Sequence, residues 1–323
     1  MIRGRRIFIT GGAGFIGSTL AGRLIDENEV VIFDNFRRDA LQSQTYREHR
    51  NLTVIKGDVL DADAVQLAMA GADVVVHCAA IAGIDTVVQS PVTTMRVNMV
   101  GSANVLEAAS KLKRCDRVVC FSTSEVFGQQ SFRASETGGA VIGEIGEARW
   151  TYAVSKLAEE HLAIAYYRER WLPTTVVRPF NVYGPGQVGE GALRTFVLRA
   201  LQHETLHIHG DGTQIRAWCY VDDMVDATLL AMEHPKAPGE SFNIGNQTAV
   251  TTMYGLANTV IRVLNSRSTV EFTRKEYADV ELRVPSVEKS RSLLGFTAKV
   301  DLEEGIRRAA AYYAEQLKPG LVA

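Results

Sequence analysis

The chain has 323 residues, of which 46% are hydrophobic and 22% are charged, and its formal net charge is −2 at pH 7. This length predicts roughly two domains, or one large α/β domain with an elaborated lobe. The near-balanced charge gives no reason to expect a nucleic acid or an anionic membrane as partner, and no apolar run approaches the ~18 residues of a membrane span.

Short runs rich in valine and isoleucine alternate with helical stretches over the first half of the chain. The runs are continuous, which is typical of strands buried on both faces of a parallel sheet. Because strands and helices follow each other as βαβ units, we predict a Rossmann-like, doubly wound α/β fold. The predicted strands are "RIFIT", "EVVIFD", "LTVIKGD", "DVVVHCAA", "RVVCFST" and "TTVVRP", and the predicted helices include one from Phe15, "DADAVQLAMA", "MRVNMVGSANVLEAASKL" and "YAVSKLAEEHLAIAYYRER".

This rhythm changes after "NVYGPG". We therefore predict a dinucleotide-binding domain at residues 1–184, with return segments near 218–246. Residues 185–217 and 247–315 are predicted to form a smaller mixed α/β lobe that interleaves with it, and residues 316–323 a frayed tail.

The four cysteines show no metal-ligand spacing and no disulfide framework. Glycines interrupt the apolar stretch in "MIRGRRIFITGGAGFIG", where a signal peptide needs an unbroken one. We therefore expect a cytoplasmic protein without a bound metal.

The stretch "IFITGGAGFIGSTL" has the pattern of a strand, a glycine loop and a helix, with Gly11, Gly14 and Gly17 spaced three apart. The early glycines permit a tight turn and a close backbone approach to a pyrophosphate, and the third lets the helix pack on the strand. The alternative is a glycine-rich turn without a ligand. The position of the motif after the first strand favours dinucleotide binding.

Two acidic residues end the strands that follow. Asp34, at the end of "EVVIFD", lies where a carboxylate binds the adenosine ribose hydroxyls and repels a 2′-phosphate, which predicts NAD. Arg37 and Arg38 follow closely and leave NADP open as the alternative. Asp58 ends the third strand and is predicted either to meet the adenine amino group or to cap the next helix.

Tyr152 and Lys156 stand four apart at the start of a long predicted helix, so they share one face. A lysine ammonium favours the phenolate of a tyrosine, which then takes a proton from a substrate hydroxyl while a hydride goes to NAD⁺. Thr123 follows a predicted sheet strand, and its hydroxyl is placed to bond the reacting oxygen. The alternative for Tyr152 and Lys156 is an exposed helix face.

Motifs spread over essentially the whole chain resemble those of extended short-chain dehydrogenase/reductases, in the family of NAD-dependent nucleotide-sugar epimerases, dehydratases and decarboxylases. They are "GGAGFIG", "VVVHCAA", "RVNMVGSANVLEAA", "STSEVFG", "YAVSK", "RPFNVYGPG", "GDGTQIRAWCYVDDMVDA" and "FNIGN". The resemblance implies an enzyme that oxidises C4 of a nucleotide-linked sugar to a ketone and holds NADH for a later step. It also implies that the smaller lobe binds the nucleotide sugar and that helices near 94–112 and 152–170 form a homodimer contact.

The same resemblance assigns roles to individual residues. Thr123, Tyr152 and Lys156 carry the oxidation, and Asn98 lies near the active-site helix. Asn181 contacts the phosphates of the nucleotide sugar, Arg216 contacts its pyrophosphate or lies near the reacting sugar, and Arg283 is a candidate for the nucleotide. Further residues expected at the cofactor are Phe15, Ile16, Asn35, Val59, Ala79, Ala80 and Asn98.

The residues after Thr123 decide the step that follows oxidation. Family dehydratases that act on dTDP-glucose carry Thr-Asp-Glu, whereas this chain carries Thr-Ser124-Glu125, an order that resembles UDP-glucuronate decarboxylases. Serine is a poor proton donor for a departing hydroxyl, and loss of carbon dioxide needs no such donor. We therefore expect decarboxylation of a UDP-hexuronate, with Glu125 either the base for a C5 proton or a structural residue.

Other functions stay open at this point: 4-epimerisation, 4,6- or 5,6-dehydration, reduction of a free ketone, and a non-catalytic dinucleotide sensor. A hexuronate carboxylate needs a cation nearby. The loop "GQVGEGALRTF" contains Glu190 and no cation before Arg194, so Arg149, Arg194 or Arg216 is expected to supply it.

Overall fold

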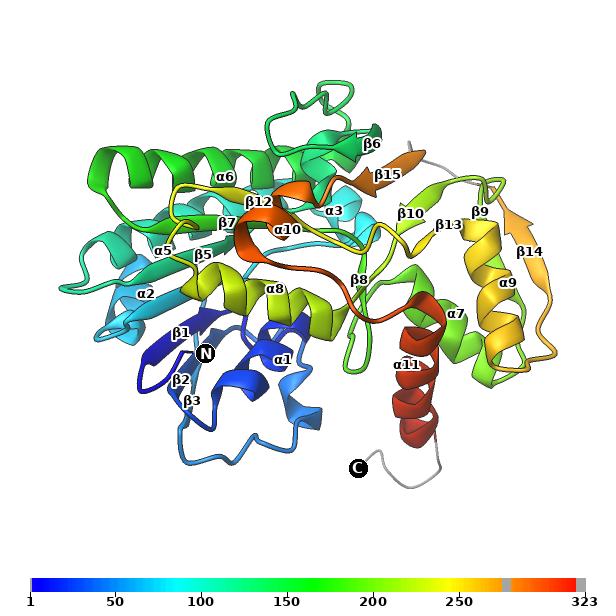
Figure 1. The fold of residues 1–323 in the computed structure, drawn as a ribbon, viewed down its shortest axis with the longest axis horizontal. Coiled ribbons are helices and arrows are strands. Elements are labelled where there is room, and N and C mark those ends of the chain that lie inside the picture. Colours follow the sequence, from blue (N-terminus) through cyan, green and yellow to red (C-terminus); the bar gives the residue numbers. More distant parts are fainter. Residues whose placement is uncertain (1, 275–279, 318–323) are drawn as a thin grey trace.

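The central feature of the fold is a parallel β-sheet. A computed structural model describes residues 2–274 and 280–317, and Figure 1 shows the sheet within them. All neighbouring strands in this sheet are parallel, and the strand order reverses between β1 and β4, as in a doubly wound fold. The seven strands, in spatial order, are β12 (Ser241–Ile244), β7 (Thr174–Pro179), β5 (Arg117–Phe121), β4 (Val74–His77), β1 (Arg6–Thr10), β2 (Glu29–Asp34) and β3 (Leu52–Lys56).

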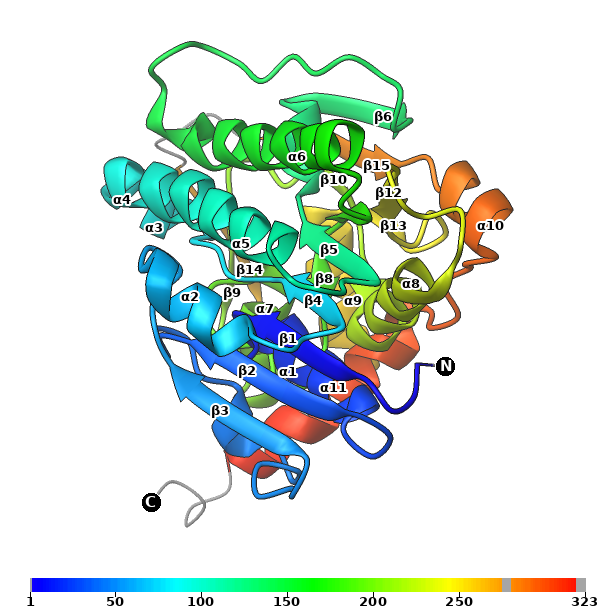
Figure 2. The ribbon, with the colours of Figure 1, turned by 90° about the vertical axis from the view of Figure 1, so that its left-hand side faces the viewer.

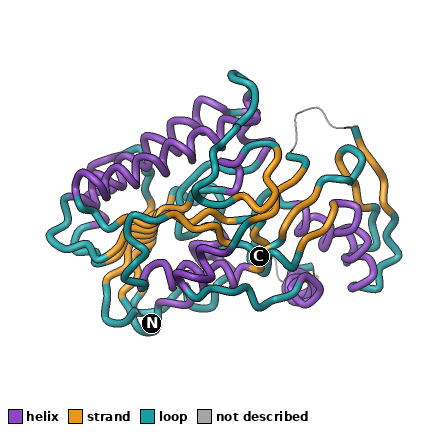
Figure 3. Tube along the Cα trace, turned by 45° about the horizontal axis from the view of Figure 1, so that its top comes forward, coloured by secondary structure: helices purple, strands orange, loops and turns teal. Residues whose placement is uncertain are grey.

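Helices cover both faces of this sheet, because the side chains of each strand alternate between two apolar surfaces. Ile7 and Ile9 of β1 pack with one helical layer, and Phe8 between them packs with the other. Figures 2 and 3 show the sheet between these layers. The prediction of a doubly wound α/β fold is confirmed. The first layer contains α1 (Phe15–Leu24) and α8 (Val221–Glu233), and the second contains α2 (Ala62–Met69), α5 (Gly101–Ser110) and α6 (Thr151–Arg170).

The helix predicted from "MRVNMVGSANVLEAASKL" is irregular in its first half. Three helical segments follow one another here: α4 (Pro91–Met95), a π-helical turn at Arg96–Val100, and α5. A π-helical turn inside a longer helix often marks a functional position. The turn contains Asn98, one of the predicted site residues.

The smaller lobe packs around an apolar cluster of its own and lies on the right of Figure 1. Its helices are α7 (Ala192–Leu201), α9 (Met253–Val263) and α11 (Leu302–Gln316), beside a two-stranded parallel sheet of β9 (Leu206–His209) and β14 (Val270–Thr273).

A four-stranded sheet joins the two halves of the chain. Its strands, in spatial order, are β13 (Val250–Thr252), β10 (Ile215–Ala217), β15 (Leu282–Pro285) and β6 (Gln130–Ala134). β6 lies between β5 and α6 in the sequence, yet it pairs in parallel with β15 from near the C-terminus. Strands from the first and the second half of the chain therefore form one sheet.

The remaining elements are short. Of the tail predicted at 316–323, Gln316 ends α11, Leu317 follows it, and the rest lies outside the described residues. Among the helices that the structure describes, none combines the length and apolar character needed to cross a membrane. The short elements used below are β8 (Val182–Tyr183), β11 (Cys219–Tyr220), α3 (Ile84–Gln89), α10 (Glu288–Leu294) and 3₁₀ turns at Ser124–Phe127 and Ala148–Trp150.

Candidate active site

The glycine loop between β1 and α1 leaves room for backbone only. Gly11 has a φ of +66°, and a Cβ at this position would lie 2.5 Å from the backbone nitrogen of Ala79. A Cβ on Gly17 would lie 2.6 Å from the carbonyl oxygen of Gly11. Gly14 caps α1 and brings no side chain to the N–H groups of the first helical turn. Such a cradle suits a pyrophosphate.

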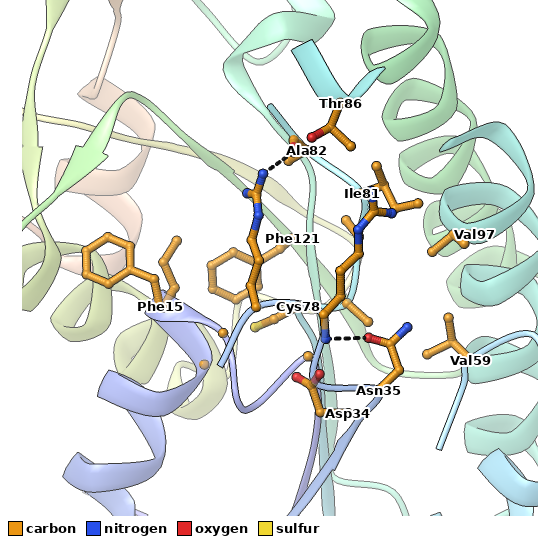
Figure 4. Close-up of a pocket in the computed structure, with 18 of the residues that line it drawn as sticks. Phe15, Asp34, Asn35, Val59, Cys78, Ile81, Ala82, Thr86, Val97 and Phe121 are labelled. Atoms are coloured by element: carbon orange, nitrogen blue, oxygen red, sulfur yellow. Dashed lines mark hydrogen bonds between the residues drawn. The ribbon is translucent and has the colours of Figure 1, made fainter. Parts of the chain in front are cut away.

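Asp34 ends β2 beside this loop. Its carboxylate accepts hydrogen bonds from the backbone N–H groups of Ala13, at 2.9 Å, and Phe36, at 2.8 Å. Burial raises the pKa of Asp34, and these two hydrogen bonds oppose the rise. Figure 4 shows Asp34 next to Asn35 in the wall of a pocket. The local fold therefore holds an acid where the sequence predicts the ribose-binding one.

The pocket is a cavity of about 480 Å³, lined by residues that directly follow β1, β2, β3, β4 and β5. Ligands of doubly wound sheets bind at this edge. Its apolar walls include Phe15, Val59, Ile81 and Val97, labelled in Figure 4. Of the predicted site residues, the cavity brings together Gly11, Gly14, Phe15, Ile16, Gly17, Asp34, Asn35, Asp58, Val59, Ala79, Ala80, Thr123, Tyr152 and Lys156.

Asp58 lies in the cavity wall, where it accepts a hydrogen bond from the backbone N–H of Leu60 at 2.9 Å. The alternative prediction, that Asp58 caps α2, is wrong. Asp61 caps this helix, by accepting from the N–H of Ala64 at 3.0 Å. Asp58 therefore stays a candidate for the adenine contact.

Asn98 is fully buried and does not line the cavity. Its side-chain amide bonds both backbone groups of Ile81, at 2.8 and 3.1 Å, and donates to the Ser155 hydroxyl at 3.0 Å. Asn98 thus ties the segment after β4 to α6, which carries Tyr152 and Lys156. Its place in the structure is that of a positioning residue.

Thr123, Tyr152 and Lys156 all line the cavity. Tyr152 and Lys156 lie one turn apart near the start of α6, and Thr123 precedes a 3₁₀ turn whose Glu125 N–H it accepts at 3.2 Å. Burial raises the pKa of Tyr152, whereas the Lys156 ammonium and the Thr123 hydroxyl lower it. The three residues are placed as a hydroxyl-oxidation site requires.

Glu125 lies in a clamp of two arginines. Arg149 donates to both of its oxygens, at 2.6 and 3.2 Å, and Arg283 donates at 3.4 Å. Burial alone would raise the pKa of Glu125, but Arg283 and Arg149 outweigh it and lower that pKa. We call these three residues the Glu125 clamp. A carboxylate held in this way is a weak base.

A third arginine lies next to the clamp. Arg216 of β10 and Arg283 of β15 are register partners on adjacent parallel strands, and both are largely buried. Arg216 donates to the backbone carbonyl of Val280 at 2.5 Å. Asn181 adopts a left-handed backbone conformation, with φ of +38°, and donates to the carbonyl of Ala217 at 2.7 Å. Two of the predicted substrate arginines thus hold one carboxylate, and Arg216 lies on the strand next to that of Arg283.

Arg194 lies elsewhere. Its guanidinium lies over the ring of Tyr313, 5.7 Å from the centroid, and donates to the carbonyl of Gly189 at 3.4 Å. The structure therefore does not group Arg194 with the Glu125 clamp, and its expected role as a substrate cation stays a prediction. The cause is that α7 points this side chain towards α11.

Comparison with known proteins establishes the family. The model described as "NAD dependent epimerase/dehydratase family" matches residues 7–245, more than half of the chain. The chain belongs to this family. It is therefore an enzyme, and its cofactor is NAD.

Relatives within the family span nearly the whole chain. A UDP-N-acetyl-alpha-D-glucosaminuronate decarboxylase of Bacillus cytotoxicus is 34% identical over 322 residues, 96% of this chain and 98% of that protein. UDP-glucuronic acid decarboxylase 1 of Danio rerio is 30% identical, over 97% of this chain and 74% of that protein. The crystal structure of UDP-glucuronic acid 4-epimerase from Bacillus cereus, in complex with UDP-glucuronic acid and NAD, superposes with a TM-score of 0.87 at 28% identity, covering 96% and 99% of the two chains.

The cavity residues fit the cofactor of the NAD-dependent epimerase/dehydratase family. The glycine cradle accepts a pyrophosphate, and Asp34 disfavours a 2′-phosphate. Arg38, which had left NADP open, donates to the carbonyl of Ala82 at 3.0 Å, a contact drawn in Figure 4. Its guanidinium is thus engaged at the Ala82 carbonyl, and Arg37, the other arginine that had left NADP open, also lines the cavity.

Glu190 bridges the smaller lobe to this cofactor side. It accepts from the Thr86 hydroxyl at 2.9 Å and from the Asp85 N–H at 3.3 Å, and it lies 3.7 Å from the Arg38 guanidinium. We call these contacts the Glu190 bridge. Glu190 also lines the cavity. This role of Glu190 was not predictable from the sequence, because its partners Asp85 and Thr86 are 105 and 104 positions away and Arg38 is further still.

Glu159 is a second residue that the sequence analysis missed. It lies one turn after Lys156 on α6, and its carboxylate accepts from the Lys156 ammonium at 2.5 Å. The i,i+3 spacing in "YAVSKLAEE" was the available signal.

Proposed function

We propose that this enzyme oxidises C4 of a UDP-linked hexuronate and then removes C6 as carbon dioxide. The proton of the C4 hydroxyl goes to Tyr152, which Lys156 and Thr123 assist. The cavity residues would hold NAD, which would supply the acceptor for the C4 hydride and its donor once carbon dioxide has left. The C4 ketone takes up the electron pair of the breaking C5–C6 bond, and C5 is then protonated.

The Glu125 clamp is the observation that carries this proposal. Dehydration needs a base for the C5 proton and an acid for the departing hydroxyl. Glu125 is engaged by Arg149 and Arg283, which stabilise its carboxylate and weaken it as a base. Residue 124 is a serine, a poor acid. Decarboxylation needs neither group, because the leaving carboxylate supplies the electron pair itself.

The charge of the site supports an anionic substrate. Arg149, Arg216 and Arg283 bring guanidinium groups to this part of the molecule, and Glu125 pairs with Arg149 and Arg283. Guanidinium groups bind carboxylate and phosphate oxygens in a planar, paired geometry. A UDP-hexuronate carries both kinds of group. The names of the two decarboxylase relatives favour the same substrate class.

A second candidate is 4-epimerisation of the same substrate. It is favoured by the similarity to the Bacillus cereus epimerase, which was solved with UDP-glucuronic acid. It is also compatible with the Glu125 clamp, since rotation of a 4-keto sugar needs no base at C5.

The decisive experiment is a mass-resolved product assay. Purified protein with NAD is incubated separately with UDP-glucuronate and UDP-N-acetylglucosaminuronate. A product that has lost carbon dioxide supports the proposal, whereas an isomer of unchanged mass means epimerisation and loss of water means dehydration. Either of the last two outcomes refutes decarboxylation.

A variant pair then tests the arginine cluster. We expect Arg283→Gln to slow product formation by about 10- to 100-fold, because a hydrogen bond to a charged group contributes about 1.5–3 kcal/mol. Arg199→Gln is the matched control, since Arg199 donates to the Thr205 carbonyl in the smaller lobe at 3.0 Å. Equal rates of product formation in the two variants would show that the arginine cluster takes no part in the reaction.

We also propose that the enzyme is a cytoplasmic homodimer. Apolar side chains are exposed on neighbouring helical segments, with Val92 at 72%, Val100 at 47% and Val154 at 42% exposure. The segments that carry them, α4, the π-helical turn and α6, are in contact. Light scattering on wild-type protein and on Val100→Glu should give a dimer and a monomer respectively, and a monomeric wild type would refute the contact.

The cytoplasmic location is supported by four free cysteines.

A further inference from the structure

Lys156 forms a buried ion pair with Glu159, which lies one turn further along the same face of α6. The ammonium nitrogen and Oε2 of Glu159 are 2.5 Å apart, and the exposed fractions of the two side chains are 1% and 0%. Lys156 lines the cavity, whereas Glu159 does not. The proposed function uses Lys156 as the positive charge that favours the Tyr152 phenolate. A carboxylate at contact distance removes most of this charge from the site.

No other cation among the described residues around the pair compensates Glu159. His77 of β4 is bonded to the Thr10 hydroxyl at 2.7 Å and to the Ser102 hydroxyl at 2.8 Å, all inside the core. Burial, helped by Lys156, lowers the pKa of His77 to about 3, so its ring is neutral. The charges of Lys156 and Glu159 therefore compensate each other.

The other titratable groups that face the pair are either neutral or acidic. Burial raises the pKa values of the Cys78 and Cys120 thiols, which keeps them neutral. Glu160, the next residue of α6, is paired with Arg178 of β7. The remaining charged groups that act on Tyr152, Lys156 or their buried neighbours are the Glu125 and Asp34 carboxylates, from the 3₁₀ turn and β2.

We propose that Glu159 is a positioning residue that neutralises Lys156 and thereby sets the pH at which Tyr152 becomes a base. This inference rests on the proposed role of Tyr152. A lone ammonium at this position would favour the phenolate, whereas an ion pair presents only a dipole. Glu159 thus keeps the Tyr152 phenol protonated to a higher pH than Lys156 alone would.

The electrostatics around the two residues agree with this geometry. Burial disfavours the Lys156 ammonium, but the Glu159 carboxylate, with smaller contributions from Tyr152 and Cys120, outweighs burial and raises the pKa of Lys156. For Tyr152, burial raises the pKa, Lys156 lowers it, and both Glu125 and Glu159 raise it further. Removing the charge of Glu159 leaves Lys156 as the uncompensated neighbour.

The test is a titration of Tyr152 in the NAD-loaded protein without substrate. The chain has ten tyrosines. The phenolate absorbance of each protein is therefore compared with that of the same protein carrying Tyr152→Phe. We expect Glu159→Gln to lower the pKa of Tyr152 by about one to three units, the range for a newly effective opposite charge. An unchanged or higher pKa overturns the proposal.

Glu160→Gln is the matched control, because it breaks a buried ion pair on the same helix without touching Lys156. We expect it to reduce stability and to leave the pKa of Tyr152 in place. A shift as large as that of Glu159→Gln would show a general packing effect and overturn the proposal. If Glu159→Gln does not fold, Glu159→Met gives the same measurement.

The titration separates this inference from the proposed function. Tyr152 ionises without substrate, so its pKa is measured even if the product assay finds no loss of carbon dioxide. With an active substrate, the rate of NAD reduction is measured as a function of pH. The fall in this rate on the acid side should move to lower pH in Glu159→Gln. A fall at the same pH as in the wild type counts against the proposal.

Discussion

Arg149 donates hydrogen bonds to both carboxylate oxygens of Glu125, at 2.6 and 3.2 Å, with the exposed fractions of the two side chains at 3% and 15%. We expect Glu125→Gln to lower the free energy of unfolding by about 3–5 kcal/mol, because it removes the charged acceptor of a largely buried ion pair. Urea unfolding measures this. The control is Glu303→Gln, which breaks an exposed pair with Arg262 and should change the free energy of unfolding far less, because solvent screens such a pair. Similar losses in both variants would contradict the clamp.

The same carboxylate makes stability depend on pH in a defined direction. Arg283 and Arg149 lower the pKa of Glu125 in the folded state. Its stabilising contribution is therefore full above the unfolded pKa, about 4.3 for a glutamate, and is lost as the pH falls through the lower folded value. The unfolding free energies of wild type and Glu125→Gln should converge in acid. If the difference in unfolding free energy between the two proteins stays constant until the protein unfolds in acid, the pKa of Glu125 is not lowered.

Gly11→Ala tests the cofactor cradle. The new Cβ would lie 2.5 Å from the backbone of Ala79, in a backbone conformation with φ of +66°. Since neither backbone can yield without opening the loop, we expect NAD binding to fall below detection in calorimetry. Gly139→Ala is the control, because no atom lies within 4 Å of a Cβ there. Tight NAD binding by Gly11→Ala would show that the loop is not the pyrophosphate site.

The Glu190 bridge should slow release of the cofactor. Glu190→Gln weakens the contacts to Arg38, Thr86 and Asp85. The side chains of Arg38 and Glu190 are each about one-third exposed. Each such contact contributes about 0.5–1.5 kcal/mol, so we expect NADH to dissociate about 2- to 10-fold faster. Stopped-flow fluorescence measures this rate. Glu204→Gln, which breaks a solvent-exposed pair with Arg199, should leave it unchanged. An unaltered rate in Glu190→Gln would separate the bridge from cofactor retention.

The sequence predicted those parts of the fold and site that depend on residues close to one another in the sequence. The strand runs, the glycine spacing and the pair Tyr152–Lys156 are local patterns, and the structure brings them to one cavity. Asp61 instead of Asp58 caps α2 because both acids precede the same helix and only the backbone geometry distinguishes them.

The contacts that define the chemistry were not predictable in the same way. Glu125 meets Arg149 and Arg283, which are 24 and 158 positions away. No local pattern shows that β15 inserts between β6 and β10 and so delivers Arg283. Glu159 was visible at helical spacing, but only burial reveals that it faces the core and pairs with Lys156.

The insertion of β15 also matters for the order in which the protein matures during synthesis. The glycine loop, Tyr152 and Lys156 are translated well before Arg283, so a growing chain contains every strand of the cofactor sheet while the anion-binding arginines are still incomplete. A premature stop codon ahead of β15 would remove the strand that joins β6 to β10. A chain that ends there would contain Tyr152 and Lys156 and would lack Arg283, one of the two arginines of the Glu125 clamp.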